Sequence, residues 1–218
     1  FYTTLRNGLG ELFFGLDWRG IARVPTAVSR RELKAKRVTL LPDQTRSSLL
    51  GRLPEFECMY TIHIRAAPQT VVSLLGQFGE VDRPYLNPRW VSIRRTAGAP
   101  LQEGSIISYR VFAGLITFSI ELQPGTGDKL LVYKVTDGFA HGGSFVFEVE
   151  ALPSGYSDLT IYLAFDYVRG RTLPERIYWR LFKLFFPEFI HDVLWNHALC
   201  EIKHRAETKA PVSWQMQL

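Results

Sequence analysis

The chain has 218 residues, which is enough for one well-buried core with an extension and too little for two domains of ordinary size. Its hydrophobic content of 46%, with 13% aromatic and 22% charged residues, excludes extensive disorder, and its apolar runs fall short of the roughly 20 residues that span a bilayer. The net charge of +5 arises entirely in residues 1–55, where 10 Lys and Arg meet 5 Asp and Glu, and these acids interrupt the pattern that nucleic acid would require.

Residues 1–55 carry mixed signals, and we assign them to a basic N-terminal extension. A short helix is indicated by "LRNGLGELFF", a strand by "RVTLL", and a turn or linker by "PDQTRSS". The pattern becomes regular over 57–65, "ECMYTIHIR", where every second residue is apolar. This period of two predicts a half-buried strand.

A helix and six further strands are predicted next. Pro68 suits the first turn of a helix, and "QTVVSLLGQF" continues with apolar residues at helical spacing. Short turns rich in Gly, Pro and Asp then separate strands at 91–96, 104–112, 115–123, 129–136, 143–152 and 158–168. Residues 174–186 and 187–207 are two predicted helices that meet at Pro187. The short connections indicate an antiparallel meander and not parallel crossovers.

One face of this sheet is predicted to be apolar and the other polar. The apolar phase holds Tyr60, Ile62, Ile64, Ile107, Tyr109, Val111, Ile116, Phe118, Ile120, Leu131, Tyr133, Val135, Phe145, Phe147, Val149, Ile161, Leu163 and Phe165. The opposite phase holds Ser108, Arg110, Thr117, Ser119, Glu121, Lys134, Glu148, Glu150, Thr160 and Asp166. A curved sheet covered by one helix can fill its apolar face with side chains or leave a ligand-sized cavity there, and the strand pattern alone allows both.

The order of these motifs resembles a known family. The opening "YTIHIRAAPQTVVSLLGQFGEVDRPYLNP", the later "EGSIISYRV", the hairpin "FVFEVEALPSGYSDLTIYLAFDY" and the closing "ALCEIKHRAE" are similar to the START-related helix-grip (SRPBCC) superfamily, in particular its polyketide cyclase/dehydrase branch. The closing motif carries the terminal pattern Ile202, Lys203 and Glu207. The resemblance covers residues 56–208.

The resemblance implies an α+β helix-grip fold. In this fold a curved seven-stranded antiparallel sheet wraps around a long C-terminal helix, two small helices follow the first strand, and a hydrophobic cavity lies inside. Residues 56–208 would form this ligand-binding domain, and 209–218 a tail. Family members carry lipids, sterols, quinones or hormones, or cyclise and dehydrate polyketide-like substrates. They share no catalytic signature, so the cavity transfers to this chain and no catalytic residue does.

We therefore expect binding, and in a carrier also transport, of a hydrophobic small molecule such as a lipid, isoprenoid or polyketide, without a cofactor. The predicted ligand-binding residues are Tyr60, Tyr109, Tyr133, Phe118, Phe145, Phe147, Leu163, Leu194, Trp195 and Ala198. The alternative is a cyclase or dehydratase in which a cavity histidine moves a proton and a tyrosine polarises a carbonyl. A third hypothesis is an interaction module whose cavity is vestigial and whose basic extension (1–55) and helix at 174–186 dock on a partner or a membrane.

Few polar side chains are candidates for chemistry on the apolar face. His141, in the turn "DGFAHGGSF", could act as an acid or base at a cavity mouth or be a solvated loop residue. Tyr109 and Tyr133 could donate to a ligand carbonyl or bond within the core. Of the neighbours Arg94 and Arg95 one must face inward, where it could bind an anion, although exposure at the strand end is the plainer alternative.

The last helix contains three histidines. At about 100° per residue, His191 falls on the apolar stripe with Trp195 and Ala198, where it is either a core histidine or a polar group of the cavity. His197, Glu201 and His204 share another face, and one helix alone does not build a closed metal site. We therefore expect no metal and treat His191 and His141 as tentative catalytic residues.

Two further expectations concern location and partners. The helix at 174–186 sets Arg176, Arg180 and Lys183 among apolar residues, which is typical of membrane-surface or lid helices, and also of a helix packed on the sheet rim. Cys58 and Cys200 are too few for a disulfide framework or a zinc site, so we expect a reduced, cytoplasmic protein.

Overall fold

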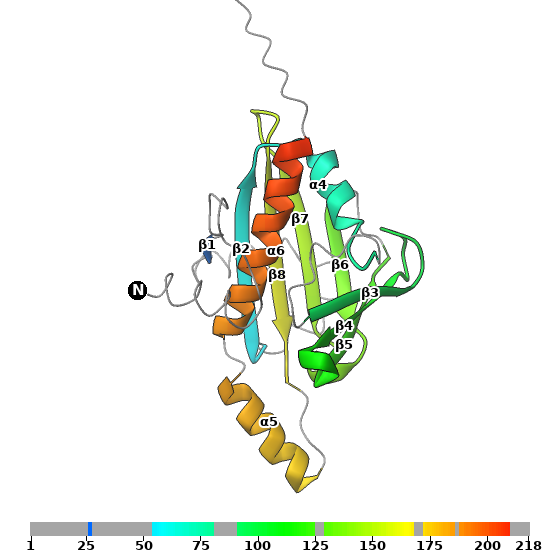
Figure 1. The fold of residues 1–218 in the computed structure, drawn as a ribbon, viewed down its shortest axis with the longest axis vertical. Helices are drawn as coiled ribbons and strands as arrows, with labels where there is room; N and C mark the ends of the chain where they lie inside the picture. Colours follow the sequence, from blue (N-terminus) through cyan, green and yellow to red (C-terminus); the bar gives the residue numbers. More distant parts are fainter. Residues whose placement is uncertain are drawn as a thin grey trace, which may run out of the picture.

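A curved antiparallel sheet wraps around the C-terminal helix in this computed structural model (Figure 1). The structure describes residues 26–27, 54–80, 91–124, 129–167, 172–185 and 188–209. Within the last two helices, the side chains of 182–185, 188–193, 196 and 209 lie outside the described part. Among the described residues, no helix is both long enough and apolar enough to cross a membrane.

The elements follow the predicted order. The strands are β2 (Phe56–Ile64), β3 (Val91–Ala97), β4 (Ile106–Val111), β5 (Ile116–Leu122), β6 (Leu130–Val135), β7 (Ser144–Ala151) and β8 (Ser157–Phe165). The helices are α4 (Pro68–Leu75), α5 (Leu173–Phe185) and α6 (Glu188–Lys209), with short 3₁₀ turns η2 (Phe112–Gly114) and η3 (Gly138–Ala140). The predicted α+β fold class is confirmed. The second small helix expected after the first strand would fall in 81–90, outside the described residues.

The sheet order is β1-β2-β8-β7-β6-β5-β4-β3, with every pair antiparallel. Strand β2 joins the last strand, β8, and the remaining strands follow as a meander. The two-residue strand β1 (Thr26–Ala27) adds an eighth member at the edge of β2, which the sequence had not predicted. The helix and strand expected elsewhere in 1–55 lie outside the described residues.

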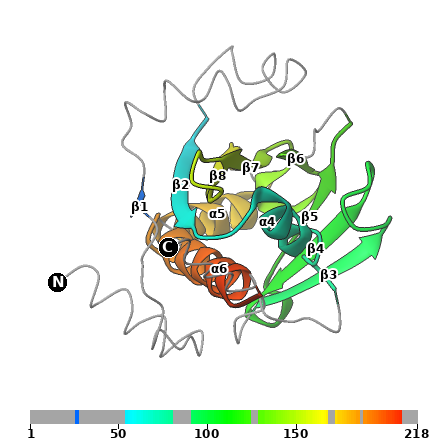
Figure 2. The ribbon, with the colours of Figure 1, turned by 90° about the horizontal axis from the view of Figure 1, so that it is seen from above.

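The period-two alternation places the predicted residues on the concave face. All the strand residues assigned to this face are buried except Phe118, which is half-buried against the core. Viewed from above, α6 and α4 lie side by side within the curve of the sheet (Figure 2). They cover this face with Val71, Leu74 and Leu75 from α4, and with Trp195, Leu199 and Ile202 among others from α6. The apolar layer between sheet and helices is thus the main core of the molecule.

The convex face is less polar than predicted. Around β2, β8, β7 and β6 it holds a second apolar cluster, whose members are Met59, Val132, Val146, Tyr162 and Ala164. Each of them is at most 2% exposed, and Thr160, assigned to the wet phase, is also buried. The Tyr162 hydroxyl donates to Glu57 Oε1 at 2.7 Å. The expectation of a wholly wet face is wrong here, because both strand phases are apolar in this part of the sheet.

The end of α6 is bonded to the end of β2. Lys203 Nζ donates to the His63 carbonyl at 2.6 Å, and the backbone N–H of Arg65 donates to Glu207 Oε1 at 2.9 Å. Lys203 and Glu207 also form an ion pair of 3.2 Å one helical turn apart. This gives the terminal Ile-Lys-x-x-x-Glu pattern a structural role, since Ile202 is buried and the two charged residues fix the helix against the strand.

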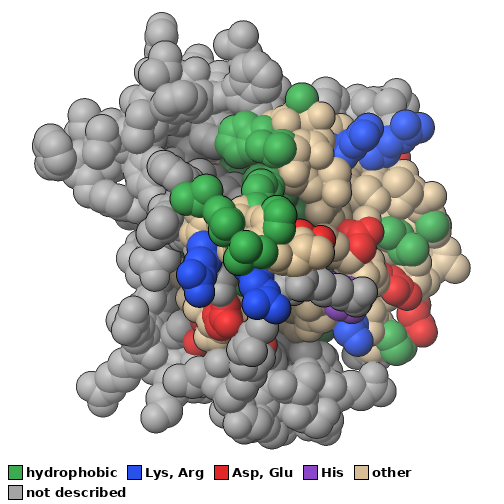
Figure 3. Space-filling view, turned by 90° about the horizontal axis from the view of Figure 1, so that it is seen from below, with side chains coloured by type: hydrophobic (Ala, Val, Ile, Leu, Met, Phe, Trp, Pro, Cys, Tyr) green, Lys and Arg blue, Asp and Glu red, His purple; other side chains and the backbone are tan. Residues whose placement is uncertain are grey.

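Helix α5 projects from the end of the molecule opposite α4 (Figure 1). A capping box begins it: the Glu175 N–H donates to Thr172 Oγ1, and the Thr172 N–H donates to Glu175 Oε2. Seen from this end, hydrophobic side chains gather over the helix next to basic ones (Figure 3).

Candidate functional site

A narrow cavity lies between the concave face of the sheet and α4, and we call it the inner cavity. No space in it is wide enough to admit a water molecule. Its walls come from β4, β5, β6, β7 and the end of α4, through Leu75, Phe78, Ile107, Tyr109, Ile120, Leu131, Tyr133 and Phe147. Three of the predicted ligand-binding residues, Tyr109, Tyr133 and Phe147, belong to this lining. None of the described lining residues comes from α6, and the side chains nearly close the cavity.

Tyr109 is the polar group that stands out in this wall. Its hydroxyl oxygen is fully buried and has no hydrogen-bond partner among the described residues. Burial, and secondarily the proximity of Tyr133, raise the pKa of Tyr109 well above its ordinary value, so the phenol is neutral and remains a donor. A buried hydroxyl without a partner costs about 1–3 kcal/mol, which a ligand acceptor placed beside it would recover in part.

Tyr133 provides a second phenol in the same wall. Burial raises its pKa to about 12, and the positive charge of Arg95 acts in the opposite direction. Its ring meets Phe147 edge-on, with the centroids 5.9 Å apart. The inner cavity thus has two neutral phenols in an otherwise apolar wall, and its described lining contains no His, Asp, Glu, Lys or Arg.

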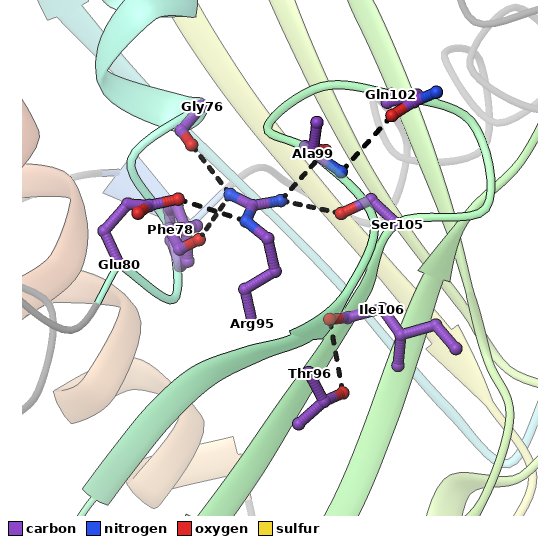
Figure 4. A network of polar contacts seen from close by, with 9 residues as sticks. All are labelled: Gly76, Phe78, Glu80, Arg95, Thr96, Ala99, Gln102, Ser105 and Ile106. Carbon is purple, nitrogen blue, oxygen red and sulfur yellow. Dashed lines mark hydrogen bonds and ion pairs between the residues drawn. The ribbon is translucent and has the colours of Figure 1, made fainter.

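Arg95 is the inward member of the arginine pair, and its contacts are made within the protein (Figure 4). Its Nε donates to Glu80 Oε1 at 3.1 Å, and Nη2 donates to the carbonyls of Gly76 and Phe78 at 2.8 and 2.9 Å. Nη1 donates to Ser105 Oγ at 2.6 Å. With its donors engaged and its side chain only 10% exposed, Arg95 holds the end of α4 against β3 and β4. Arg94 is exposed.

A group of aromatic rings surrounds the inner cavity. Phe118 stacks on Tyr109 and touches the edge of Phe139, with centroids 5.5 Å apart. Phe145 and Phe147 both contact Trp195 of α6, at 5.9 and 6.1 Å. Tyr109, Tyr133 and Phe147 are the predicted ligand-binding residues that line the cavity itself. The others, Tyr60, Phe118, Phe145, Leu163, Leu194, Trp195 and Ala198, belong to the apolar core around it.

A second cavity, which we call the rim cavity, lies where α5 meets the sheet. It has a volume of about 210 Å³ and is lined by Leu115, Ile116, Thr117, Gly138, Phe139, Tyr178 and Trp179. None of these residues was predicted as a site residue. The signals for them were the Gly-rich turn "DGFAHGG" and the amphipathic helix, which occur far apart in the sequence. Phe139 lines this cavity and contacts Phe118, so these two rings stand between the rim cavity and Tyr109.

The two histidines proposed as catalytic residues lie in the turn after η3 and in α6. His141 follows η3, is exposed, and its Nδ1 lies 2.7 Å from the Thr136 carbonyl oxygen. It lines neither the inner nor the rim cavity. His191 lies in α6, and its side chain is outside the described part of the structure. Their catalytic roles remain predictions.

The polar face predicted on α6 carries His197, Glu201 and His204. Glu201 is paired with Arg205 at 2.8 Å, and His204 is exposed. In the described part of the chain, no group of three or more His, Cys, Asp or Glu residues is arranged to hold a metal ion. Elsewhere, His63 Nδ1 lies 3.0 Å from Asp158 Oδ1 at the side of the sheet.

Comparison with known proteins supports the fold. The structure is similar to TTHA0849 from Thermus thermophilus, at 14% identity and a TM-score of 0.53, over 72% of this chain and 100% of that one. A START superfamily protein from Mycobacterium smegmatis aligns over 70% of this chain and 97% of its own, at 13% identity and a TM-score of 0.49. Ginseng major latex-like protein 151 from Panax ginseng aligns over 66% and 95%, at 12% identity and a TM-score of 0.44.

No protein-family model and no curated protein sequence matches this chain. At these identities the likeness is one of fold. The helix-grip fold expected from the sequence is confirmed, since a curved antiparallel sheet surrounds α6 and the structure of TTHA0849 is similar.

Proposed function

We propose that this chain binds a hydrophobic small molecule in the inner cavity, between the concave face of the sheet and α4, and that Tyr109 orients it through a hydrogen bond. The ligand class is a lipid, isoprenoid or polyketide that carries a carbonyl or another acceptor within an apolar skeleton. The observation that carries the proposal is the buried Tyr109 hydroxyl without a described partner, in a wall that is otherwise almost entirely apolar.

Apolar burial and the Tyr109 hydrogen bond contribute free energies of different size to binding. Removing about 300 Å² of apolar ligand surface from water would contribute roughly 7 kcal/mol, before the costs of association and of opening the cavity. One neutral hydrogen bond contributes about 1 kcal/mol. The apolar wall therefore supplies most of the affinity, and Tyr109 favours ligands with an acceptor at one position over ligands without it.

Binding requires the aromatic wall to open. Ligand pockets usually enclose about 300–1,000 Å³, whereas the inner cavity does not admit water. Phe118 is half-buried, stacks on Tyr109 and is followed by Phe139 and then by the rim cavity. We propose that a ligand reaches Tyr109 by displacing these two rings from the side of the rim cavity.

The alternative function is a cyclase or dehydratase. It needs an acid or base within reach of the bound substrate, and the described lining of the inner cavity contains only phenols as titratable groups. Both phenol pKa values are raised, which suits hydrogen-bond donation and disfavours proton abstraction near neutral pH. His191 would have to supply the missing group. Binding is therefore the better-supported function.

The experiment compares two probes in two variants. The fluorescent ketone prodan and its analogue with the carbonyl reduced to methylene are titrated into the parent protein, Tyr109→Phe and the control Tyr162→Phe. The control removes a phenol from the convex face, where it bonds to Glu57. We expect Tyr109→Phe to lower the affinity for the ketone by about fivefold or more and to leave the affinity for the reduced analogue unchanged.

Tyr162→Phe should leave the preference for the ketone intact. If neither probe binds the parent protein, the binding proposal fails. If the probes bind but Tyr109→Phe affects both equally or neither, the assigned role of Tyr109 is wrong.

A further inference from the structure

Helix α5 presents an apolar face to solvent. Leu173 is 70% exposed, and Ile177, Tyr178 and Leu181 are between two fifths and about half exposed. Leu115, which lies beside them across the rim cavity, is 69% exposed. We call these five residues the α5 surface. They account for five of the six exposed large hydrophobic residues in the described part of the chain, so exposed apolar area is concentrated at one end of the molecule (Figure 3).

The geometry of the helix separates this face from a basic edge. At about 100° per residue, Leu173, Ile177 and Leu181 form one stripe, and the exposed Arg176 and Arg180 border it on one side. Trp179 lies on the opposite side of the helix, packs against the main core and helps to line the rim cavity. The helix is thus attached through Trp179, with its apolar stripe facing away.

Glu175, the acidic residue of α5, bonds to Thr172 at the start of the same helix. Glu175 is engaged in the capping box with Thr172, where its carboxylate accepts from the Thr172 N–H at 3.2 Å. Its carboxylate therefore acts at the helix N-terminus, and the exposed Arg180 places a basic charge at the border of the apolar stripe. An apolar stripe with arginines along its edge complements a surface that is apolar beneath and negatively charged at its boundary.

We propose that the α5 surface docks this protein on an anionic lipid bilayer. The apolar stripe and Leu115 enter the headgroup boundary, and Arg176 and Arg180 pair with lipid phosphates and carboxylates. Because Leu115 and Tyr178 belong both to this surface and to the lining of the rim cavity, the rim cavity opens toward the membrane. The inference requires no ligand in the inner cavity and is tested without one.

The test is sedimentation of the full chain with vesicles of phosphatidylcholine alone or mixed with phosphatidylserine. Two double variants alter the α5 surface: Ile177→Ser with Leu181→Ser, and Arg176→Gln with Arg180→Gln. Two controls make equivalent changes elsewhere. Tyr156→Ser removes the exposed aromatic residue of the β7–β8 turn, and Arg94→Gln with Lys134→Gln removes two exposed charges from the sheet.

We expect the parent protein to bind the mixed vesicles in preference to neutral ones, and each α5 variant to reduce its partition coefficient on the order of tenfold. The controls should remain within about twofold of the parent protein. Absence of binding to mixed vesicles overturns the proposal. So does an equal loss in the Arg94 and Lys134 control, which would indicate attraction by net charge alone.

Light scattering tests the alternative that the α5 surface is a dimer interface. If the parent protein is a dimer that Ile177→Ser with Leu181→Ser converts to a monomer, and vesicle binding is unaffected, the α5 surface is an interface between two copies and the membrane proposal is wrong.

Discussion

The ring of Phe118 lies flat against the ring of Tyr109, with centroids 4.6 Å apart and ring planes within 4° of parallel. The two residues face each other across β4 and β5, where they are paired in the register of the sheet. Tyr109 is fully enclosed, whereas Phe118 is half-buried. Phe118 therefore covers one of the two phenols in the lining of the inner cavity, and displacement of its ring would uncover Tyr109.

Phe118→Ala is predicted to raise affinity for prodan while lowering stability. The free energy of unfolding should fall by about 2–3 kcal/mol, toward the low end for a phenylalanine-to-alanine change because Phe118 is only half-buried. Affinity for the ketone should rise severalfold, since the ligand no longer has to displace the ring. Urea unfolding and fluorescence titration measure the two effects.

Phe56→Ala is the control for this variant. Phe56 is buried, stacks on Phe165 at 4.8 Å and lines neither cavity. It should destabilise the protein without increasing prodan binding. A rise in affinity of the same size in both variants would mean that general loosening of the core, and not Phe118, controls access to Tyr109.

The two neighbouring arginines should differ sharply in their effect on stability. Arg95→Gln leaves the carbonyls of Gly76 and Phe78 and the hydroxyl of Ser105 without their shared donor, so we expect a loss of about 2–4 kcal/mol in the free energy of unfolding. Arg94→Gln changes an exposed residue and should remain within about 0.5 kcal/mol. Similar losses in the two variants, measured by urea unfolding, would contradict the structural role of Arg95.

The buried phenols predict loss of stability at alkaline pH. The pKa of Tyr133 is raised from 10.0 to about 12, so the folded state holds this proton more tightly than the unfolded chain does. Below pH 10 the contribution is fully present; between about pH 10 and 12 the unfolded chain ionises first, and the free energy of unfolding should decline by about 1.4 kcal/mol per pH unit. Tyr109, whose pKa is raised further, adds to the same decline.

Tyr133→Phe and Tyr109→Phe should each make this pH profile shallower, as measured by urea unfolding at a series of alkaline pH values. Tyr156→Phe controls for the loss of an exposed hydroxyl. A profile that keeps its slope when both buried phenols are replaced would show that their ionisation does not limit alkaline stability.

The sequence predicted which strand residues face the core better than it predicted how side chains contact one another there. A strand alternates with period two, so the inward residues of six strands could be assigned from hydrophobicity. For the strand at 91–96 the sequence showed only that one of Arg94 and Arg95 faces inward, and the structure identifies it as Arg95. The partners of Arg95 could not be predicted. They come from the segment that follows α4, through Gly76 and Phe78, and from Ser105 before β4, and these segments meet only in the tertiary structure.

The candidate site was predictable only in outline. Tyr109 and Tyr133 were assigned to the cavity wall by phase alone, but the near closure of the cavity depends on how the side chains from α4 and four strands pack together. The rim cavity is lined by residues in and next to β5, η3 and α5. These elements lie far apart in the sequence, so no local pattern could predict the cavity. The convex cluster around Val146 was missed because strands that are apolar in both phases give no alternation to interpret.

Gly138 lines the rim cavity at the point where η3 lies against Thr117 and Phe118 of β5. Gly138 and Gly155 both have φ of +77°, a left-handed conformation that costs an alanine about 1–2 kcal/mol. A Cβ at Gly155 would meet nothing within 4 Å, whereas a Cβ at Gly138 would collide with the Thr117 carbonyl oxygen and the Phe118 side chain. Gly138→Ala should therefore lower the free energy of unfolding by about 1–3 kcal/mol more than Gly155→Ala does. Because the collision pushes η3 away from β5, prodan binding should change in Gly138→Ala and not in Gly155→Ala. Urea unfolding and titration of both variants check this, and equal stability losses with unchanged binding would mean that η3 is not held against Phe118.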